Sequence, residues 1–205
     1  MIDDEFVNLL LADRDYLTLL NRENCLTLEC SPAHLVEFCQ HLRDEETFVL
    51  LSDLTAIDHG DSAENRFSTV YHFYSLVHND YLRIHSPCAG KDSPAVPSIS
   101  NLFPAANWHE REVYDMFGIN FTDHPNLKRI LMWDEYPYFP LRKEFPLAGI
   151  EVPLPAADVA EVTGAEVDPA PMMGGPFVSA GHGRMSTAEP RAKDESWTEG
   201  EEKPL

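Results

Sequence analysis

Apolar residues in the first third of the chain follow first a helical and then a strand period. An apolar stripe over residues 2–11 predicts a short helix, and the alternating run at residues 25–30 predicts a strand. A second helix is expected at residues 31–43, with Ser31 as its N-cap and Pro32 at its first position. Its inner face is formed by apolar residues at three-and-four spacing, namely Leu35, Phe38, Cys39 and Leu42.

Three further runs are typical of strands. Residues 48–57 and 66–77 are rich in β-branched and aromatic side chains, and residues 81–85 follow a short turn at residues 79–80. Residues 58–65 are polar and contain a glycine, so they are expected to form a loop. Together these elements predict an α+β domain over residues 1–119, in which helices pack on a mainly antiparallel or mixed sheet.

The most highly charged helix is expected at residues 107–117. Asn107 is a favourable N-cap, and Glu110 follows three residues later, as in a capping box. Gly118 suits the left-handed position that ends many helices. Arg111 and Asp115 are four residues apart, so we expect them to pair on one face. The buried side is expected to consist of Val113, Met116 and Phe117.

Regular periodicity stops after residue 118. Eleven of the 16 prolines lie from Pro125 onward, yet residues 121–147 are rich in large aromatic and apolar side chains, which disordered linkers lack. Ordering a backbone costs roughly 1–2 kcal/mol per residue, so an extended apolar segment needs a surface that another structure provides. We therefore predict that residues 120–150 dock in an extended form on the chain's own domain or on another protein. Residues 151–205 are predicted to form an irregular tail.

The distribution of charge favours a protein partner for this segment. The 205-residue chain has 35 acidic and 15 basic residues and a formal net charge of −20, which argues against direct binding of nucleic acid or anionic lipid. Residues 121–150 carry four acidic and four basic side chains, so they form the one part that is not strongly negative. The cores of protein interfaces are likewise depleted of charge and enriched in aromatic residues and arginine.

The expected compartment is the cytoplasm. No apolar run approaches the roughly 20 residues that span a bilayer, and the acidic start of the chain is unlike a secretory signal. The cysteines form no C-x-x-C pair, so we expect them to be reduced and mostly buried. They are Cys25, Cys30, Cys39 and Cys88.

Candidate residues for catalysis or metal binding are few. His109, Glu112 and Asp115 lie at helical spacing, but no second histidine completes an H-E-x-x-H motif. Glu110 and Glu112 are two residues apart and would point to different sides of a helix, so an enzyme that uses this region is the less favoured hypothesis. We expect no catalytic, metal-binding or cofactor-binding residue on this chain.

Several runs together resemble one known family. They are A-A-N-W-H-E-R-E-V-Y-D-M-F-G-I at residues 105–119, H-P-N-L-K-R-I-L at residues 124–131 and P-L-R-K-E-F-P-L at residues 140–147. With weaker similarity upstream, residues 48–147 resemble the C-type, or 30 kDa, subunit family of NADH:quinone oxidoreductase, respiratory complex I. Two positions depart from the family pattern. Asp123 replaces a frequent glycine, which weakens the expectation of a left-handed turn, and Glu144 replaces an aspartate.

This resemblance implies a structural, non-catalytic subunit of the hydrophilic arm of a proton-pumping complex. Such a complex passes electrons from NADH through FMN and iron–sulfur clusters to quinone, and those cofactors belong to partner subunits. The implied partners are other hydrophilic-arm subunits, especially the D-type (49 kDa) subunit and the cluster-bearing B-type and I-type subunits. The implied location is the cytoplasmic side of the bacterial inner membrane, reached only through the complex. A homologous scaffold subunit of a membrane-bound hydrogenase-type or ferredoxin-linked complex stays open as the alternative.

The motif residues are the candidates for fixing turns and for bridging to partner subunits. For Arg142 we favour a salt bridge between proteins over a clamp for a small carboxylate or phosphate. The full set of candidates is Glu110, Arg111, Glu112, Tyr114, Asp115, Phe117, Gly118, His124, Pro125, Arg129, Pro140, Arg142, Lys143 and Glu144.

Overall fold

A computed structural model describes residues 4–22 and 25–146 of the chain. The predicted tail at residues 151–205 lies outside the described residues. Contacts between residues divide the chain into two compact units, residues 1–134 and residues 135–205. The first part of the predicted docking segment, residues 120–134, is therefore grouped with the α+β domain.

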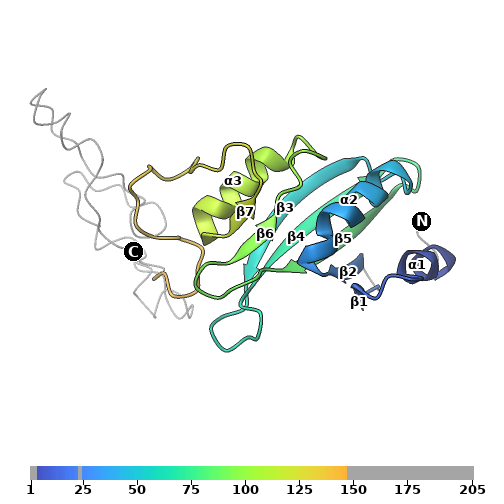
Figure 1. Cartoon of the computed structure of the whole chain (residues 1–205), viewed down its shortest axis with the longest axis horizontal. Helices are drawn as coiled ribbons and strands as arrows, with labels where there is room; N and C mark the ends of the chain where they lie inside the picture. Colours follow the sequence, from blue (N-terminus) through green and yellow to red (C-terminus); the bar gives the residue numbers. More distant parts are fainter. Residues whose placement is uncertain (1–3, 23–24, 147–205) are drawn as a thin grey trace, which may run out of the picture. The chain divides into compact units, whose positions relative to one another are not determined.

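The first unit is built on a five-stranded sheet with the strand order β1-β2-β5-β4-β3 (Figure 1). Strands β2 and β5 run parallel, and the other neighbouring strands pair antiparallel. The predicted α+β class with a mainly antiparallel or mixed sheet is confirmed. The five strands are β1 (Leu17–Asn21), β2 (Leu26–Cys30), β3 (Leu50–Asp58), β4 (Phe67–Ser75) and β5 (Asp80–Pro87).

The three predicted helices are confirmed as α1 (Asp4–Leu11), α2 (Leu35–Asp44) and α3 (Ala106–Phe117). The predicted capping role of Ser31 is wrong, because its side chain makes no cap hydrogen bond. The chain instead enters α2 through a 3₁₀ turn, η1 (Pro32–His34), in which the Ser31 carbonyl accepts the His34 N–H at 3.0 Å.

The structure contains three strands that the sequence pattern did not predict. In β1 only Leu17 is buried, so no alternation of apolar and polar residues marks this edge strand. The other two are β6 (Ala95–Pro97) and β7 (Asn120–Thr122), which pair parallel in a separate two-stranded sheet. Three residues are too few to show a period.

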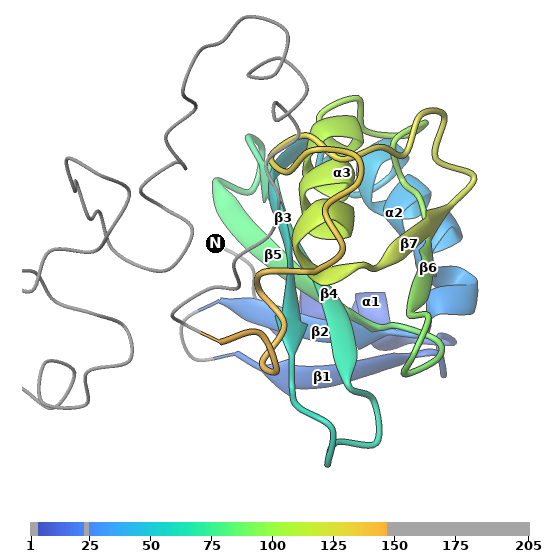
Figure 2. The same cartoon turned by 90° about the vertical axis from the view of Figure 1, so that its left-hand side faces the viewer.

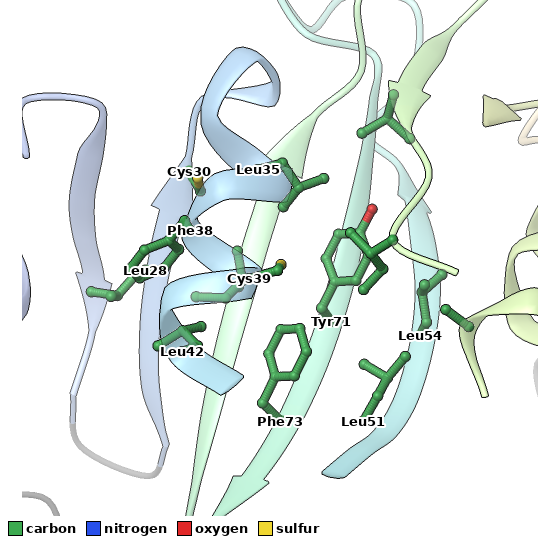
Figure 3. Packing of buried hydrophobic residues seen from close by; sticks show 14 of the residues in the cluster. Leu28, Cys30, Leu35, Phe38, Cys39, Leu42, Leu51, Leu54, Tyr71 and Phe73 are labelled. Atoms are coloured by element: carbon green, nitrogen blue, oxygen red, sulfur yellow. The ribbon is translucent and has the colours of Figure 1, made fainter. Parts of the chain in front are cut away.

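The hydrophobic core lies between the five-stranded sheet and the helices (Figure 3). Tyr71 and Phe73 of β4 are fully buried. The four predicted inner-face residues of α2, Leu35, Phe38, Cys39 and Leu42, are also fully buried. Helix α3 packs against β3, and α2 and α3 lie against the same face of the sheet (Figure 2).

All four cysteines are free, as expected. Cys30, Cys39 and Cys88 are buried, and Cys25 is partly exposed. Burial raises the pKa of the thiols of Cys30 and Cys88 to about 12, so these side chains behave as small apolar groups at neutral pH.

Candidate functional site

Helix α3 carries the longest motif of the sequence and places two acidic side chains, Glu110 and Asp115, in the interior. Both are fully buried. A buried carboxylate is costly unless hydrogen bonds or opposite charges replace its water. The partners of these two carboxylates therefore define what the helix does.

Glu110 holds the turn that follows β6. The Ser98 hydroxyl donates to its Oε2 at 2.6 Å, and the Ile99 N–H donates to its Oε1 at 2.8 Å. The Ser100 N–H donates to the Ser98 hydroxyl oxygen at 3.1 Å, which extends the network along the turn. Burial raises the pKa of Glu110 to about 7, although the hydrogen bonds from Ser98 and Ile99 act to lower it.

The predicted capping box is therefore wrong. Helix α3 begins at Ala106, with Ala105 at the N-cap position in place of Asn107 and with no side-chain cap bond. Asn107 lies inside the first turn, and Glu110 reaches the turn at Ser98 instead of the start of its own helix. The motif has capping spacing, but burial decides its partners.

Asp115 holds the segment that returns over α3 after β7 (Figure 2). Its Oδ2 accepts the backbone N–H groups of Ile130, Leu131 and Met132 at 2.9, 2.6 and 2.9 Å. Its Oδ1 accepts Nη1 of Arg129 at 2.6 Å. Burial acts to raise the pKa of Asp115, but the three amides and the guanidinium together outweigh it and hold that pKa below its ordinary value.

Arg111 binds the backbone carbonyl groups of the same segment. Its Nε donates to the carbonyl oxygen of Lys128 at 3.1 Å, and its Nη2 donates to that of Arg129 at 3.4 Å. The guanidinium carbon also lies 4.8 Å from the ring centre of Trp108. The predicted pairing of Arg111 with Asp115 is wrong, because each side chain binds residues 128–132 instead.

His124 joins the start of α3 to the turn after β7. The Asn126 N–H points at Nδ1 at 3.0 Å, so Nδ1 is the acceptor and Nε2 carries the hydrogen. Nε2 then donates to the Asn107 carbonyl oxygen at 3.1 Å and lies 3.9 Å from Oε2 of Glu110. Asp123 adopts a φ of 64°, so the left-handed turn exists despite the replacement of the family's glycine.

Gly118 ends α3 in the expected left-handed conformation, with φ 71° and ψ 27°. Its N–H donates to the Tyr114 carbonyl oxygen at 2.9 Å. Among the other candidates, Phe117 is buried, and Glu112 and Pro125 are exposed. Glu110 and Glu112 therefore differ in environment, as helical geometry predicts for residues two apart.

The second unit contributes Pro140, Arg142, Lys143 and Glu144. The guanidinium carbon of Arg142 lies 4.5 Å from the ring centre of Phe139, and its Nη1 lies 3.8 Å from Oε1 of Glu144. The Phe145 N–H donates to the Arg142 carbonyl at 3.0 Å. These contacts make a local turn around Arg142.

The motif side chains of α3 bind backbone groups of neighbouring segments of the same chain. They accept N–H groups and donate to carbonyl groups, which fixes two irregular segments that have no ladder of their own. Within residues 4–22 and 25–146, no group of three or more His, Cys, Asp or Glu side chains could hold a metal ion. The helices in this part of the chain include none that is long and apolar enough to cross a membrane.

The sequence did not identify Ser98 and Ile99 as partners of Glu110, and it did not show that Trp108 and Leu131 are exposed. Ser98 lies twelve residues before Glu110, and no local pattern connects them. Trp108 lies in the motif, but the sequence alone does not reveal that its ring is exposed.

Comparison with known proteins shows a consistent relationship. The family model described as the 30 kDa subunit of respiratory-chain NADH dehydrogenase matches residues 28–151. The C 2 subunit of the NADH-quinone oxidoreductase of Rhizobium etli is 46% identical over 120 residues, which is 58% of this chain and 63% of that protein. The C-type subunit of the same oxidoreductase in Geobacter sulfurreducens is 38% identical over 124 residues, which is 60% of this chain and 76% of that protein.

The part of the chain that aligns with the Rhizobium and Ruegeria relatives spans somewhat over three fifths of their length. One solved structure with a similar fold is that of the membrane-bound sulfane sulfur reductase, described as an archaeal respiratory membrane complex. The matching chain has a TM-score of 0.60 and 22% identity, and the match covers 79% of this chain and 91% of that one. At that identity the likeness concerns the fold alone.

Proposed function

Because this chain belongs to the family of the respiratory-chain NADH dehydrogenase 30 kDa subunit, we propose that it is a structural subunit of a proton-pumping NADH:quinone oxidoreductase. In this role the chain carries no catalytic centre. It supports electron transfer from NADH to quinone by holding neighbouring subunits of the hydrophilic arm in place.

The observation that carries this proposal is the use of the motif side chains. Asp115 binds three backbone N–H groups and one guanidinium, and Arg111 binds two carbonyl groups. Side chains engaged in this way are not available to activate a nucleophile or to move a proton to a substrate. They favour a rigid scaffold that presents the surface of α3 and the segment after it.

The finer parts of the proposal concern cofactors and partners. FMN and the iron–sulfur clusters reside on partner subunits, and the chain contacts the D-type (49 kDa) subunit together with the cluster-bearing B-type and I-type subunits. It associates with the cytoplasmic side of the bacterial inner membrane only through the complex. The high negative charge supports a protein-mediated attachment, since anionic lipid would repel a chain of net charge −20.

Purification of the complex through an affinity tag on this chain tests the proposal. We expect an NADH-oxidising assembly that contains a flavin subunit and iron–sulfur clusters, whereas the chain purified alone is colourless and shows no turnover. An untagged strain is the control for proteins that bind the resin. Turnover or tight metal binding by the isolated chain would instead support the enzyme hypothesis.

A second candidate is a scaffold subunit of a related respiratory membrane complex. The likeness of the fold to a chain of the sulfane sulfur reductase complex favours keeping it. The same purification separates the two candidates, because a flavin-bearing NADH subunit in the preparation supports the first and a hydrogenase-type or ferredoxin-linked subunit supports the second.

A further inference from the structure

Helix α3 and the segment at residues 128–132 each expose one large apolar side chain. Trp108 on α3 is 63% exposed, and Leu131 on the returning segment is 59% exposed. Arg111 contacts the ring of Trp108 and the backbone of the segment that carries Leu131. We define the tryptophan patch as Trp108, Arg111, Lys128 and Leu131, which are linked by the contact of Arg111 with Trp108 and by the hydrogen bonds of Arg111 and Asp115 to the backbone of residues 128–131.

The tryptophan patch is held in place before any partner arrives. Arg111 stacks on the indole ring and binds the carbonyl oxygens of Lys128 and Arg129. Asp115 binds the N–H of Leu131 at 2.6 Å from the buried side of α3. A surface fixed in this way loses little conformational entropy on binding, and this is a property of high-affinity interfaces.

The chemistry of the patch is that of a binding hot spot. Tryptophan and arginine are the residues most enriched where truncation weakens an interface strongly. Trp108 is 63% exposed, so coverage of its ring by a partner would remove a large apolar surface from water.

Charge identifies what the partner must offer. Both hydrogen-bond partners of Arg111 are neutral carbonyl groups, and within the described part of the chain it forms no ion pair with an acidic residue. Its Nη1 likewise makes no hydrogen bond there. Lys128, whose carbonyl oxygen accepts Nε of Arg111, is also exposed. A carboxylate is the group that best accepts hydrogen bonds from the remaining N–H groups of a guanidinium.

We propose that Trp108 and Leu131 are the apolar anchors of an interface with another protein subunit of the same complex, which offers an apolar socket bordered by a carboxylate for Arg111. This inference rests on the proposed function. A second copy of the chain is disfavoured because two bodies of net charge −20 repel each other, and an anionic membrane is disfavoured for the same reason.

A photoreactive benzoylphenylalanine at position 108, in the tagged complex purified from membranes, tests the occupant directly. We expect a covalent adduct with a different protein subunit, at a peptide that contains Asp or Glu within a few residues of the linked apolar side chain. The same probe at Tyr81, an exposed aromatic residue on β5, is the matched control and is not expected to label that peptide. An adduct with lipid or with a second copy, or no adduct in the assembled complex, overturns the inference.

A reconstitution experiment measures the contribution of the anchors. Purified full-length chain is added to membranes of a strain that lacks it, and reassembly is followed on native gels. Trp108→Ala raises the concentration needed for half-maximal reassembly roughly tenfold or more, as expected for a hot-spot residue. Tyr81→Ala leaves that concentration unchanged, and both variants unfold at the urea midpoint of the wild type within error. An unchanged concentration for Trp108→Ala contradicts the inference.

The two experiments also separate this inference from the proposed function. If the tagged chain co-purifies with the complex but position 108 gives no adduct, only the tryptophan patch is wrong. If the chain never co-purifies with any respiratory complex, the proposed function fails and the inference fails with it.

Discussion

The two buried carboxylates of α3 meet opposite electrostatic environments. Glu110 receives one O–H and one N–H donor, which is too little to offset its burial, so its pKa rises. Asp115 receives three N–H donors and a guanidinium, so its pKa falls. At neutral pH Asp115 is therefore ionised, while Glu110 is close to half-protonated.

Replacement of Asp115 by alanine is expected to be strongly destabilising. The change removes the carboxylate that accepts three backbone N–H groups and pairs with the guanidinium of Arg129, and loss of one partner of a buried charge pair costs about 3–5 kcal/mol. Urea unfolding of the full-length chain measures this loss. Glu112→Ala, at an exposed acidic position of the same helix, is the control and changes stability by less than about 0.5 kcal/mol. Equal effects of the two substitutions would show that the hydrogen bonds of Asp115 to residues 129–132 do not stabilise the fold.

The pH dependence of stability reports on Glu110. Its pKa rises from an ordinary value of 4.5 to about 7 in the folded protein, so the folded state binds the proton more tightly than the unfolded state. The stabilisation from this proton is fully present below pH 4.5 and is lost as pH rises to about 7, by up to about 3 kcal/mol. The lowered pKa of Asp115 acts in the opposite sense, because its stabilisation is lost only as pH falls below the ordinary aspartate range.

The variant Glu110→Gln isolates this effect because glutamine keeps a similar shape and does not ionise. We expect it to be progressively more stable than the wild type as pH rises from about 5 to 7, with a constant difference above that range. Urea midpoints of both full-length proteins at pH 5, 6, 7 and 8 provide the measurement. A difference that does not change with pH would mean that Glu110 titrates at an ordinary carboxyl pKa.

At the scale of elements, α3 connects parts of the fold that have few regular contacts of their own. It holds the turn after β6 through Glu110, and it holds residues 128–132 through Arg111 and Asp115. Its C-terminal end sets the direction of the chain into β7, which pairs with β6. The reversal at Gly118 therefore positions both the small sheet and the segment that follows it.

Substitution of Gly118 tests the importance of this reversal. With φ at 71°, a Cβ atom at this position costs about 1–2 kcal/mol, so Gly118→Ala should lower the free energy of unfolding by that amount. Gly118→Asn should lose less, because asparagine tolerates the left-handed region. Urea unfolding of the two variants gives the order. Equal free energies of unfolding for the two variants would show that the positive φ at position 118 does not determine the loss of stability.

At the scale of the whole molecule, acidic residues are distributed unevenly along the chain. The excess of acidic residues limits association of the chain with nucleic acid and anionic lipid. The nearly neutral residues 121–150 include the segment that Asp115 binds and the turn around Arg142. Attachment to a partner through such a segment avoids the repulsion that two acidic surfaces would meet.

Arg142→Ala is expected to lower the amount of assembled complex without unfolding the chain. Arg142 stacks on Phe139 and lies near Glu144, and it is not one of the residues that form the hydrophobic core, so we expect the chain to stay folded. Native-gel analysis of membranes measures assembly, and circular dichroism of the purified chain measures folding. Lys143→Ala, at an exposed neighbouring position, separates a specific role of the guanidinium from a general loss of positive charge. Full assembly of Arg142→Ala would contradict this role.

Much of the fold follows from local sequence. The inner face of α2, the strand at residues 67–75 and the glycine end of α3 were all predictable, because each depends on the spacing or the conformational preference of nearby residues. Strands β1, β6 and β7 were not predictable, since they are too exposed or too short to carry a period. Their pairing depends on neighbours distant in the sequence.

The sequence alone determined the α+β class, the family motif and the separation of acidic from nearly neutral segments. Only the tertiary structure decided the partners of Glu110, Arg111 and Asp115. Local spacing suggested a capping box and an ion pair four residues apart, yet the carboxylates are buried, and a buried carboxylate binds whichever donors the fold brings to it. Those donors come from residues 11 to 17 positions away along the chain.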